Sequence, residues 1–323
     1  MRLICLLLIG TWGLGQDLPS QPGFQVHDNL TLGGWFDLII SDSEGGPSDQ
    51  RIPHAFVYLD ADFTSGFRAF LEYASTDIQG QPEETQLQRA YLEFKHSTRA
   101  KWRLGQFNTP SGLWKEKHWY TMVDSNRKPA IADFRTIPME ALGLEFSGTR
   151  TTAAIEWDYS LFIARSQDKE LNSDLGYGAD LSFSIRDRFR FGSFTYQFMN
   201  SDESTDPLPG ERRALLLYTE SWLIDKQLMF RAEYLHMDRD TLEPTNGAYA
   251  KIKWQINKKT FLNYRFDESD DTRTGQPQLW QGQALTAGYW FNPRVRARLE
   301  LGQTRHKGSN WRSEWSAWVG FIL

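Results

Sequence analysis

The chain has 323 residues, with 36 basic and 41 acidic side chains and a formal net charge of −5, a balance that argues against a nucleic-acid-binding surface. Its one cysteine, Cys5, lies near the N-terminus, so the rest of the chain offers no thiol for disulfides or for cysteine-ligated metal. The 13 Trp, 12 Tyr and 21 Phe are many for a hydrophilic chain. A soluble protein would hide them in a core, whereas a transmembrane barrel places aromatic side chains outside, in girdles at the two membrane interfaces.

The N-terminus has the pattern of a secretory signal peptide. Arg2 precedes an apolar run from Leu3 to Leu14, and small residues follow at the end of the run. The run is too short to cross a bilayer as a helix, and no other stretch approaches 18 apolar residues. We predict a signal peptide over 1–16 and a mature chain over 17–323.

Apolar and polar side chains alternate with a period of two residues throughout the mature chain. Val295, Ala297 and Leu299 would face one side of a strand, and Arg296 and Arg298 the other. A change of register near Gly192 suggests a bulge. We predict sixteen strands, at 27–40, 52–62, 66–76, 85–96, 99–107, 140–148, 151–164, 175–186, 188–200, 211–223, 226–238, 246–256, 259–267, 279–291, 294–305 and 311–323.

The connections between these strands alternate in length. Short turns, such as 97–98, 148–150 and 224–225, are separated by longer polar loops such as 201–210 and 268–278. This pattern is typical of outer-membrane barrels, and an even strand number puts both termini at the short-turn, periplasmic end. A soluble β-sandwich is the alternative, but it would have to protect exposed edge strands, which a closed barrel lacks. The predicted fold is therefore all-β: one transmembrane antiparallel up-and-down barrel domain of 16 strands.

One connection, 108–139, is far longer than the others. Loops beyond about 12–15 residues inside compact architecture are usually functional. A barrel of 16 strands is too wide for its wall side chains to fill, so it holds an aqueous channel unless something obstructs it. We predict that this third long loop folds into the lumen and forms the constriction.

Three segments carry a family resemblance: LTLGGWFDLII at 30–40, LGQFNTPSGLW at 104–114 and ALGLEFSG at 141–148. They resemble segments of bacterial outer-membrane porins, and 104–114 is similar to the segment that closes the fifth strand in the phosphate-selective porin O/P-like family. Apolar side chains alternate up to the C-terminus as in outer-membrane insertion signals, although the last residue is Leu323 and not Phe. The resemblance implies a homotrimer in the bacterial outer membrane, in contact with lipid and lipopolysaccharide, with one pore per subunit.

Basic residues gather where the pore is expected. The loop carries five of them against Glu116, Asp124 and Asp133, and three arginines on one strand would follow each other at roughly 6.7 Å. A ladder of guanidinium groups can pass an anion along, although each could instead be a wall charge paired with an acid. We therefore predict a water-filled channel for passive diffusion of small hydrophilic solutes and ions, leaning to anions such as phosphate. The residues assigned to its constriction and solute path are Lys115, Lys117, Arg127, Lys128, Arg135, Lys101, Arg103, Arg89, Arg294, Arg296, Arg298 and Arg312.

Other functions fit the sequence less well. Trp114, Trp119, Tyr120 and Phe134 in the loop would suit sugar rings, so a carbohydrate or general-diffusion channel is the first alternative. A barrel enzyme is less favoured, because no G-x-S-x-G or H-E-x-x-H motif is present. An adhesin or structural barrel would need larger external loops. No catalytic residue, cofactor or metal site is expected.

Overall fold

The structure is a computed structural model. It describes residues 23–44, 49–51, 54–63, 66–76, 84–113, 124–133, 137–152, 154–166, 175–186, 188–200, 210–240, 242–271 and 278–323. The expected signal peptide, 1–16, lies outside the described residues.

The described residues form mainly β-strands. No helix among them is long and apolar enough to span a membrane. The elements are β1 (Gly23–His27), β2 (Leu30–Ser43), β3 (Asp49–Arg51), β4 (His54–Asp62), β5 (Phe67–Thr76), β6 (Glu84–Ser97), β7 (Ala100–Asn108), α2 (Ala130–Asp133), β8 (Glu140–Thr152), β9 (Ile155–Ser166), β10 (Leu175–Ile185), β11 (Phe189–Asn200), β12 (Gly210–Ile224), β13 (Leu228–Arg239), β14 (Leu242–Gln255), β15 (Thr260–Asp271), β16 (Gln278–Asn292), β17 (Val295–His306) and β18 (Arg312–Ile322).

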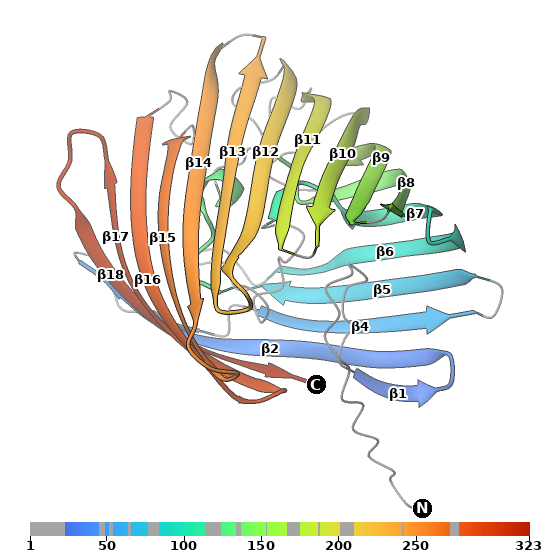
Figure 1. Ribbon diagram of the computed structural model, residues 1–323, viewed down its shortest axis with the longest axis horizontal. Coiled ribbons are helices and arrows are strands. Elements are labelled where there is room, and N and C mark those ends of the chain that lie inside the picture. Colours follow the sequence, from blue (N-terminus) through green and yellow to red (C-terminus); the bar gives the residue numbers. More distant parts are fainter. Residues whose placement is uncertain are drawn as a thin grey trace, which may run out of the picture.

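The strands close into a barrel (Figure 1). From β4 to β18 each strand pairs antiparallel with the next, and β18 pairs back onto β2 from Ile322↔Trp35 to Glu314↔Ser43. The short strands β1 and β3 both pair with β2, which leaves 16 strands in the closed wall. The predicted fold class is confirmed, and most predicted strand ends lie within a few residues of the observed ones.

The predicted turn at 148–150 is wrong. Strand β8 continues to Thr152, and Gly148 pairs with Tyr159 inside the ladder. A Cβ on Gly148 would lie 2.3 Å from the carbonyl oxygen of Arg99, so this glycine permits a close approach of neighbouring backbone and does not mark a turn.

The predicted bulge near Gly192 is also absent, because β11 pairs with β10 and β12 without a break around this residue. A Cβ on Gly192 would lie 2.2 Å from the ring of Tyr218. The glycine therefore provides the space over which an aromatic ring from the adjacent strand lies, a known way of covering glycine in a sheet.

The two faces of the wall differ in chemistry. Leu92, Leu104 and Leu144 face each other across β6, β7 and β8 in one outward row, and their exposed fractions are 59%, 61% and 38%. The opposite face carries buried polar side chains, among them Asp37 and Arg265, each with an exposed fraction of 0%. Apolar outside and polar inside is the arrangement of a transmembrane barrel.

Aromatic side chains pair on the wall near its short-turn end. Their ring centroids are 4.3–4.8 Å apart in Phe36–Phe321, Phe67–Phe94, Trp102–Phe146 and Trp157–Phe183. Each pair joins two neighbouring strands. Such rings form an aromatic girdle at one membrane interface.

The outward leucine row gives a test of which face meets lipid. We expect Leu104→Arg, at the middle of β7, to lower the free energy of unfolding in lipid vesicles by about 2–4 kcal/mol, because a charge would enter the apolar belt. Leu175→Arg, at the long-loop end of β10 and 64% exposed, is the matched control with an expected loss of about 0–1 kcal/mol. Urea titration of vesicle-embedded protein measures both values, and equal losses would contradict this assignment.

Candidate functional site

The long connection between β7 and β8 is closed at its stem and runs along the inner wall. The amide of Thr109 donates to the carbonyl of Met139 (3.0 Å), and its hydroxyl donates to the carbonyl of Pro138 (2.5 Å). Gly112, with φ of 71°, faces β12 and β13, where a Cβ would lie 2.4 Å from atoms of Leu216 and Glu233. The first described part of the loop therefore lies directly against the wall.

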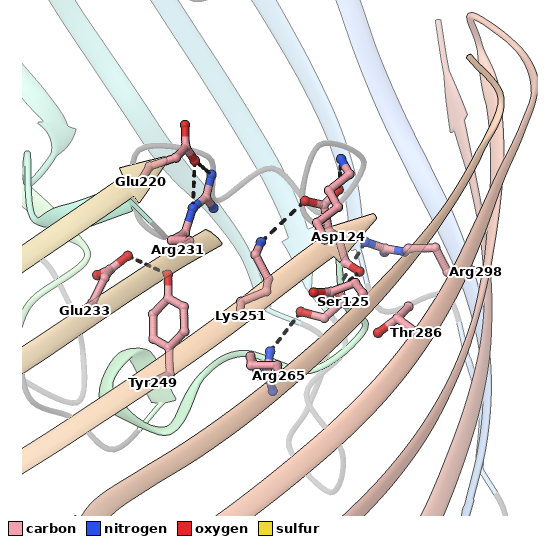
Figure 2. Close-up of polar contacts among 12 residues, drawn as sticks. Asp124, Ser125, Glu220, Arg231, Glu233, Tyr249, Lys251, Arg265, Thr286 and Arg298 are labelled. Atoms are coloured by element: carbon pink, nitrogen blue, oxygen red, sulfur yellow. Dashed lines mark hydrogen bonds and ion pairs between the residues drawn. The ribbon is translucent and has the colours of Figure 1, made fainter. Parts of the chain in front are cut away.

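Asp124 is the described loop residue that pairs with three cations of the wall. Its Oδ1 is 3.0 Å from Lys253 Nζ and 3.1 Å from Arg296 Nη2, and its Oδ2 is 3.4 Å from Lys251 Nζ. The two lysines come from β14 and the arginine from β17, and Asn263 of β15 donates to the backbone carbonyl of Asp124 (3.2 Å). Figure 2 shows Lys251 directed at this carboxylate. One loop side chain thus joins strands that are not neighbours.

Burial alone would raise the pKa of Asp124, but Lys253, Lys251 and Arg296, with Arg231 farther away, hold it well below the ordinary value. The carboxylate is therefore ionised at neutral pH, and its charge is balanced by the wall.

Two arginines of the wall, Arg265 and Arg298, donate hydrogen bonds to the loop, and Figure 2 shows both directed at Ser125. Arg265 of β15 reaches the hydroxyl of Ser125 (2.8 Å) and the carbonyls of Arg127 (2.6 Å) and Lys128 (3.3 Å). Arg298 of β17 reaches the carbonyl of Ser125 (3.1 Å). Buried carbonyl groups outside regular structure need such donors.

A carboxylate of the wall accepts hydrogen bonds from backbone amides of the loop. Glu300 of β17 accepts the backbone N–H of Asn126 (2.8 Å) and of Arg127 (3.2 Å), and it is oriented by the hydroxyl of Thr286 (2.8 Å). The side-chain amide of Asn126 donates to the hydroxyl of Ser316 on β18 (2.9 Å). Arg127 also forms an ion pair with Glu314.

Helix α2 packs on β14 and β15. A Cβ on Gly247 would lie 2.4 Å from Ile131 Cγ2, so this glycine makes room for the helix. Ala130, the first residue of the helix, forms a small buried apolar cluster with Trp280 of β16. The described residues 124–133 therefore cross the lumen side of β14–β18, far from the β7 and β8 stem in the ring of strands (Figure 1).

Four of the predicted site residues meet at this attachment: Arg127 and Lys128 of the loop, and Arg296 and Arg298 of the wall. Arg294 lies in the turn before β17, exposed, with its guanidinium 5.4 Å from the ring of Phe24. Arg312 is exposed at the start of β18. Among the predicted residues, Lys115, Lys117, Arg135, Trp114, Trp119, Tyr120 and Phe134 lie outside the described residues.

Three predicted residues lie on another part of the wall, each beside a carboxylate. Arg89 makes two hydrogen bonds to Glu72 (2.9 and 2.7 Å). Arg103 bridges Glu93 (2.8 Å) and Glu145 (2.7 Å). Lys101 is 3.9 Å from Glu93.

Three cations of the attachment were not predicted from the sequence: Lys251, Lys253 and Arg265. The period-two alternation does place them on inward faces, so the signal was present. The alternation does not indicate which inward residues contact the loop, because it is a local pattern and Asp124 and Lys251 are 127 positions apart. Among the described residues, no three His, Cys, Asp or Glu side chains gather as metal ligands would.

No protein-family model matches the chain, and no curated protein matches it. Solved structures do share its fold. OmpF of Salmonella typhi, in complex with daunomycin, is 12% identical with a TM-score of 0.70, covering 91% of this chain and 98% of that one. An anion-selective porin from Comamonas acidovorans is 10% identical with a TM-score of 0.66 (91% and 99% covered). OmpT of Vibrio cholerae, in a trimer form, is 8% identical with a TM-score of 0.62 (91% and 99% covered). At these identities the likeness establishes the porin-type barrel fold.

The loop's position can be tested by cross-linking. We expect Asn126→Cys with Ser316→Cys to form an intramolecular disulfide on mild oxidation, because the two side chains touch. Asn126→Cys with Ser182→Cys is the control, since Ser182 is a buried inner-wall serine on β10, a strand distant from β18 in the ring. Gel mobility with and without reductant measures the bond. Cross-linking of the control pair as fast as the test pair would contradict the described loop path.

The depressed pKa of Asp124 predicts an acid-resistant attachment. A carboxyl group whose pKa is lower in the folded state stabilises that state above its ordinary pKa and loses this contribution as the pH falls through the folded value. The stability that Asp124 contributes, measured as the difference in free energy of unfolding between the native protein and Asp124→Asn, should therefore stay constant from pH 7 to pH 5 and decline only below the ordinary value of 3.8.

Asp124→Asn is the matched control for the pH series. It removes the charge at every pH, so the pH dependence that other groups contribute is common to both proteins and cancels in the difference. A fall in that difference between pH 7 and pH 5 would contradict the ion pairing described here.

Proposed function

We propose that this protein is an outer-membrane porin, a water-filled channel for passive diffusion of small hydrophilic solutes and ions. The observation that carries the proposal is the inner face: a closed wall with buried charged side chains inside, crossed by a loop that is held to the strands opposite its own stem. A barrel of this strand number is too wide to be filled by its own wall. An adhesin, a structural barrel or an enzyme would give no reason for such a tethered loop.

The loop 108–139 is the constriction in this proposal. Its described part is held by side chains on β14, β15, β17 and β18, so its position does not depend on its stem alone. A segment fixed at several points keeps a constant distance from the remaining wall. Pore diameter and charge at the narrowest section then set which solutes pass.

We propose a leaning to anions, such as phosphate, on the charge of the loop. Several cations of the wall are matched by wall carboxylates, as in Arg89–Glu72, Arg231–Glu220 and Arg265–Asp267, so these pairs add little net charge. The loop has five basic residues against three acidic ones. The aromatic residues of the loop keep a carbohydrate channel as the alternative outcome of the test below.

The surroundings follow from the same proposal. The outward leucines and aromatic pairs fit a bacterial outer membrane with lipid and lipopolysaccharide around the barrel, and both termini would lie on the periplasmic, short-turn side. We propose a homotrimer, since a solved protein of this fold has a trimer form.

Reversal potentials in a salt gradient across a planar bilayer test the anion preference. We expect a preference for chloride over potassium, and Lys115→Glu with Lys117→Glu should lower the anion-to-cation permeability ratio by about threefold or more, because charge at the constriction sets selectivity. A cation preference of the native channel would overturn the proposal.

The matched control removes a wall pair of zero net charge. Arg89→Gln with Glu72→Gln should leave the ratio unchanged, because the two charges cancel at short distance. Saturable block of the current by oligosaccharides, without any charge preference, would favour the carbohydrate channel.

A further inference from the structure

Asp124 sits in a site whose cations are held by the wall itself. The ring of Phe261, on β15 and fully buried, lies under both Lys253 Nζ (4.8 Å from the ring centroid) and the Arg296 guanidinium (4.7 Å). Arg296 also lies 4.8 Å from the ring of Trp290. Cations are attracted to aromatic faces, so these rings fix two of the three charges without help from the loop.

The floor of the site is itself fixed by a glycine. A Cβ on Gly288 of β16 would lie 2.0 Å from the ring of Phe261, so only glycine lets this ring lie flat over the neighbouring strand. Lys251 has an exposed fraction of 2% and completes the set from β14. The glycine, the ring and the three cations thus form one layered site on the four strands β14 to β17.

The three cations match the two oxygens of a carboxylate. Lys253 and Arg296 share one oxygen of Asp124, and Lys251 faces the other. Charge-assisted hydrogen bonds of this kind are among the stronger polar contacts in proteins. Since the residue that fills the site belongs to the loop and not to the wall, the ligand and the site are separable.

We propose that Lys251, Lys253 and Arg296, over Phe261, form a carboxylate-binding site on the barrel wall in which Asp124 is the resident ligand. The site accepts a small free carboxylate, such as acetate, once Asp124 leaves it. A tethered ligand has a high effective concentration, so free acetate does not displace Asp124 at ordinary concentrations. Where the channel function proposed above holds, a solute carboxylate and Asp124 exclude each other, and the loop's hold on β14 and β17 depends on which of them occupies the site.

Acetate binding to purified protein in detergent tests the site directly. We expect Asp124→Ala to bind acetate saturably with a Kd of about 1 mM, measured by calorimetry and by fluorescence of the protein's tryptophans, one of which contacts Arg296. The native protein should show no binding, because its site is filled. Asp124→Ala with Lys251→Gln and Lys253→Gln should bind acetate at least about tenfold more weakly, because two of the three donors are gone.

A matched control separates this site from any vacated ion pair. Glu314→Ala also removes one carboxylate, which pairs with Arg127 of the loop. It leaves only this single guanidinium and should therefore create no acetate site. Asp124→Ser is the second variant should the alanine variant not fold, and it should bind acetate likewise.

Three results would overturn the proposal: no acetate binding by folded Asp124→Ala or Asp124→Ser, equal binding by Glu314→Ala, or chloride or inorganic phosphate binding as tightly as acetate. These measurements need no ion conduction. A protein that binds acetate but forms no channel would therefore refute the proposed function and leave this site standing.

Discussion

The need to satisfy every backbone hydrogen bond inside lipid governs this molecule. A strand sheet with free edges would leave N–H and C=O groups unpaired in the bilayer, so the sheet has to close, as it does where β18 pairs with β2. Closure with 16 strands makes the ring wide, and its inner face meets no lipid. The apolar exterior, the polar interior and the space for an inward loop are all consequences of this one constraint.

The same constraint reappears at the loop. Residues 124–128 have no strand partner and lie against the wall, 124–126 buried and 127–128 half-buried, so their amides and carbonyls need side-chain partners. Glu300 receives two amides, while Arg265 and Arg298 supply donors to three carbonyls. An inward arginine that the sequence suggests as an anion-binding residue can therefore instead donate hydrogen bonds to the loop backbone. In this barrel Arg298 holds the loop by such a contact, and Arg296 holds it through Asp124.

The sequence predicted the strands well because alternation is a local property: each residue's face follows from its neighbours two positions away. It failed at Gly148 and Gly192, where glycine was interpreted as a turn or bulge signal but serves close packing inside regular ladders. It also could not pair Asp124 with Lys251, Lys253 and Arg296. Those contacts depend on how far a long loop crosses the lumen, and no spacing in the chain records that distance.

Two charged regions of the inner wall, one around Arg89 and Arg103 and one around Phe261, take their carboxylates from different parts of the chain. Around Arg89 and Arg103, the acids Glu72, Glu93 and Glu145 come from the strands themselves. Around Phe261, aromatic rings position Lys253 and Arg296, and the ion-pair carboxylate comes from the loop. If the loop moved away, the second region would lose its ion-pair carboxylate and keep three cations. Loop position and wall charge are thus linked on the β14–β17 side, so a change in the loop there also changes the charge that the inner wall presents to the lumen.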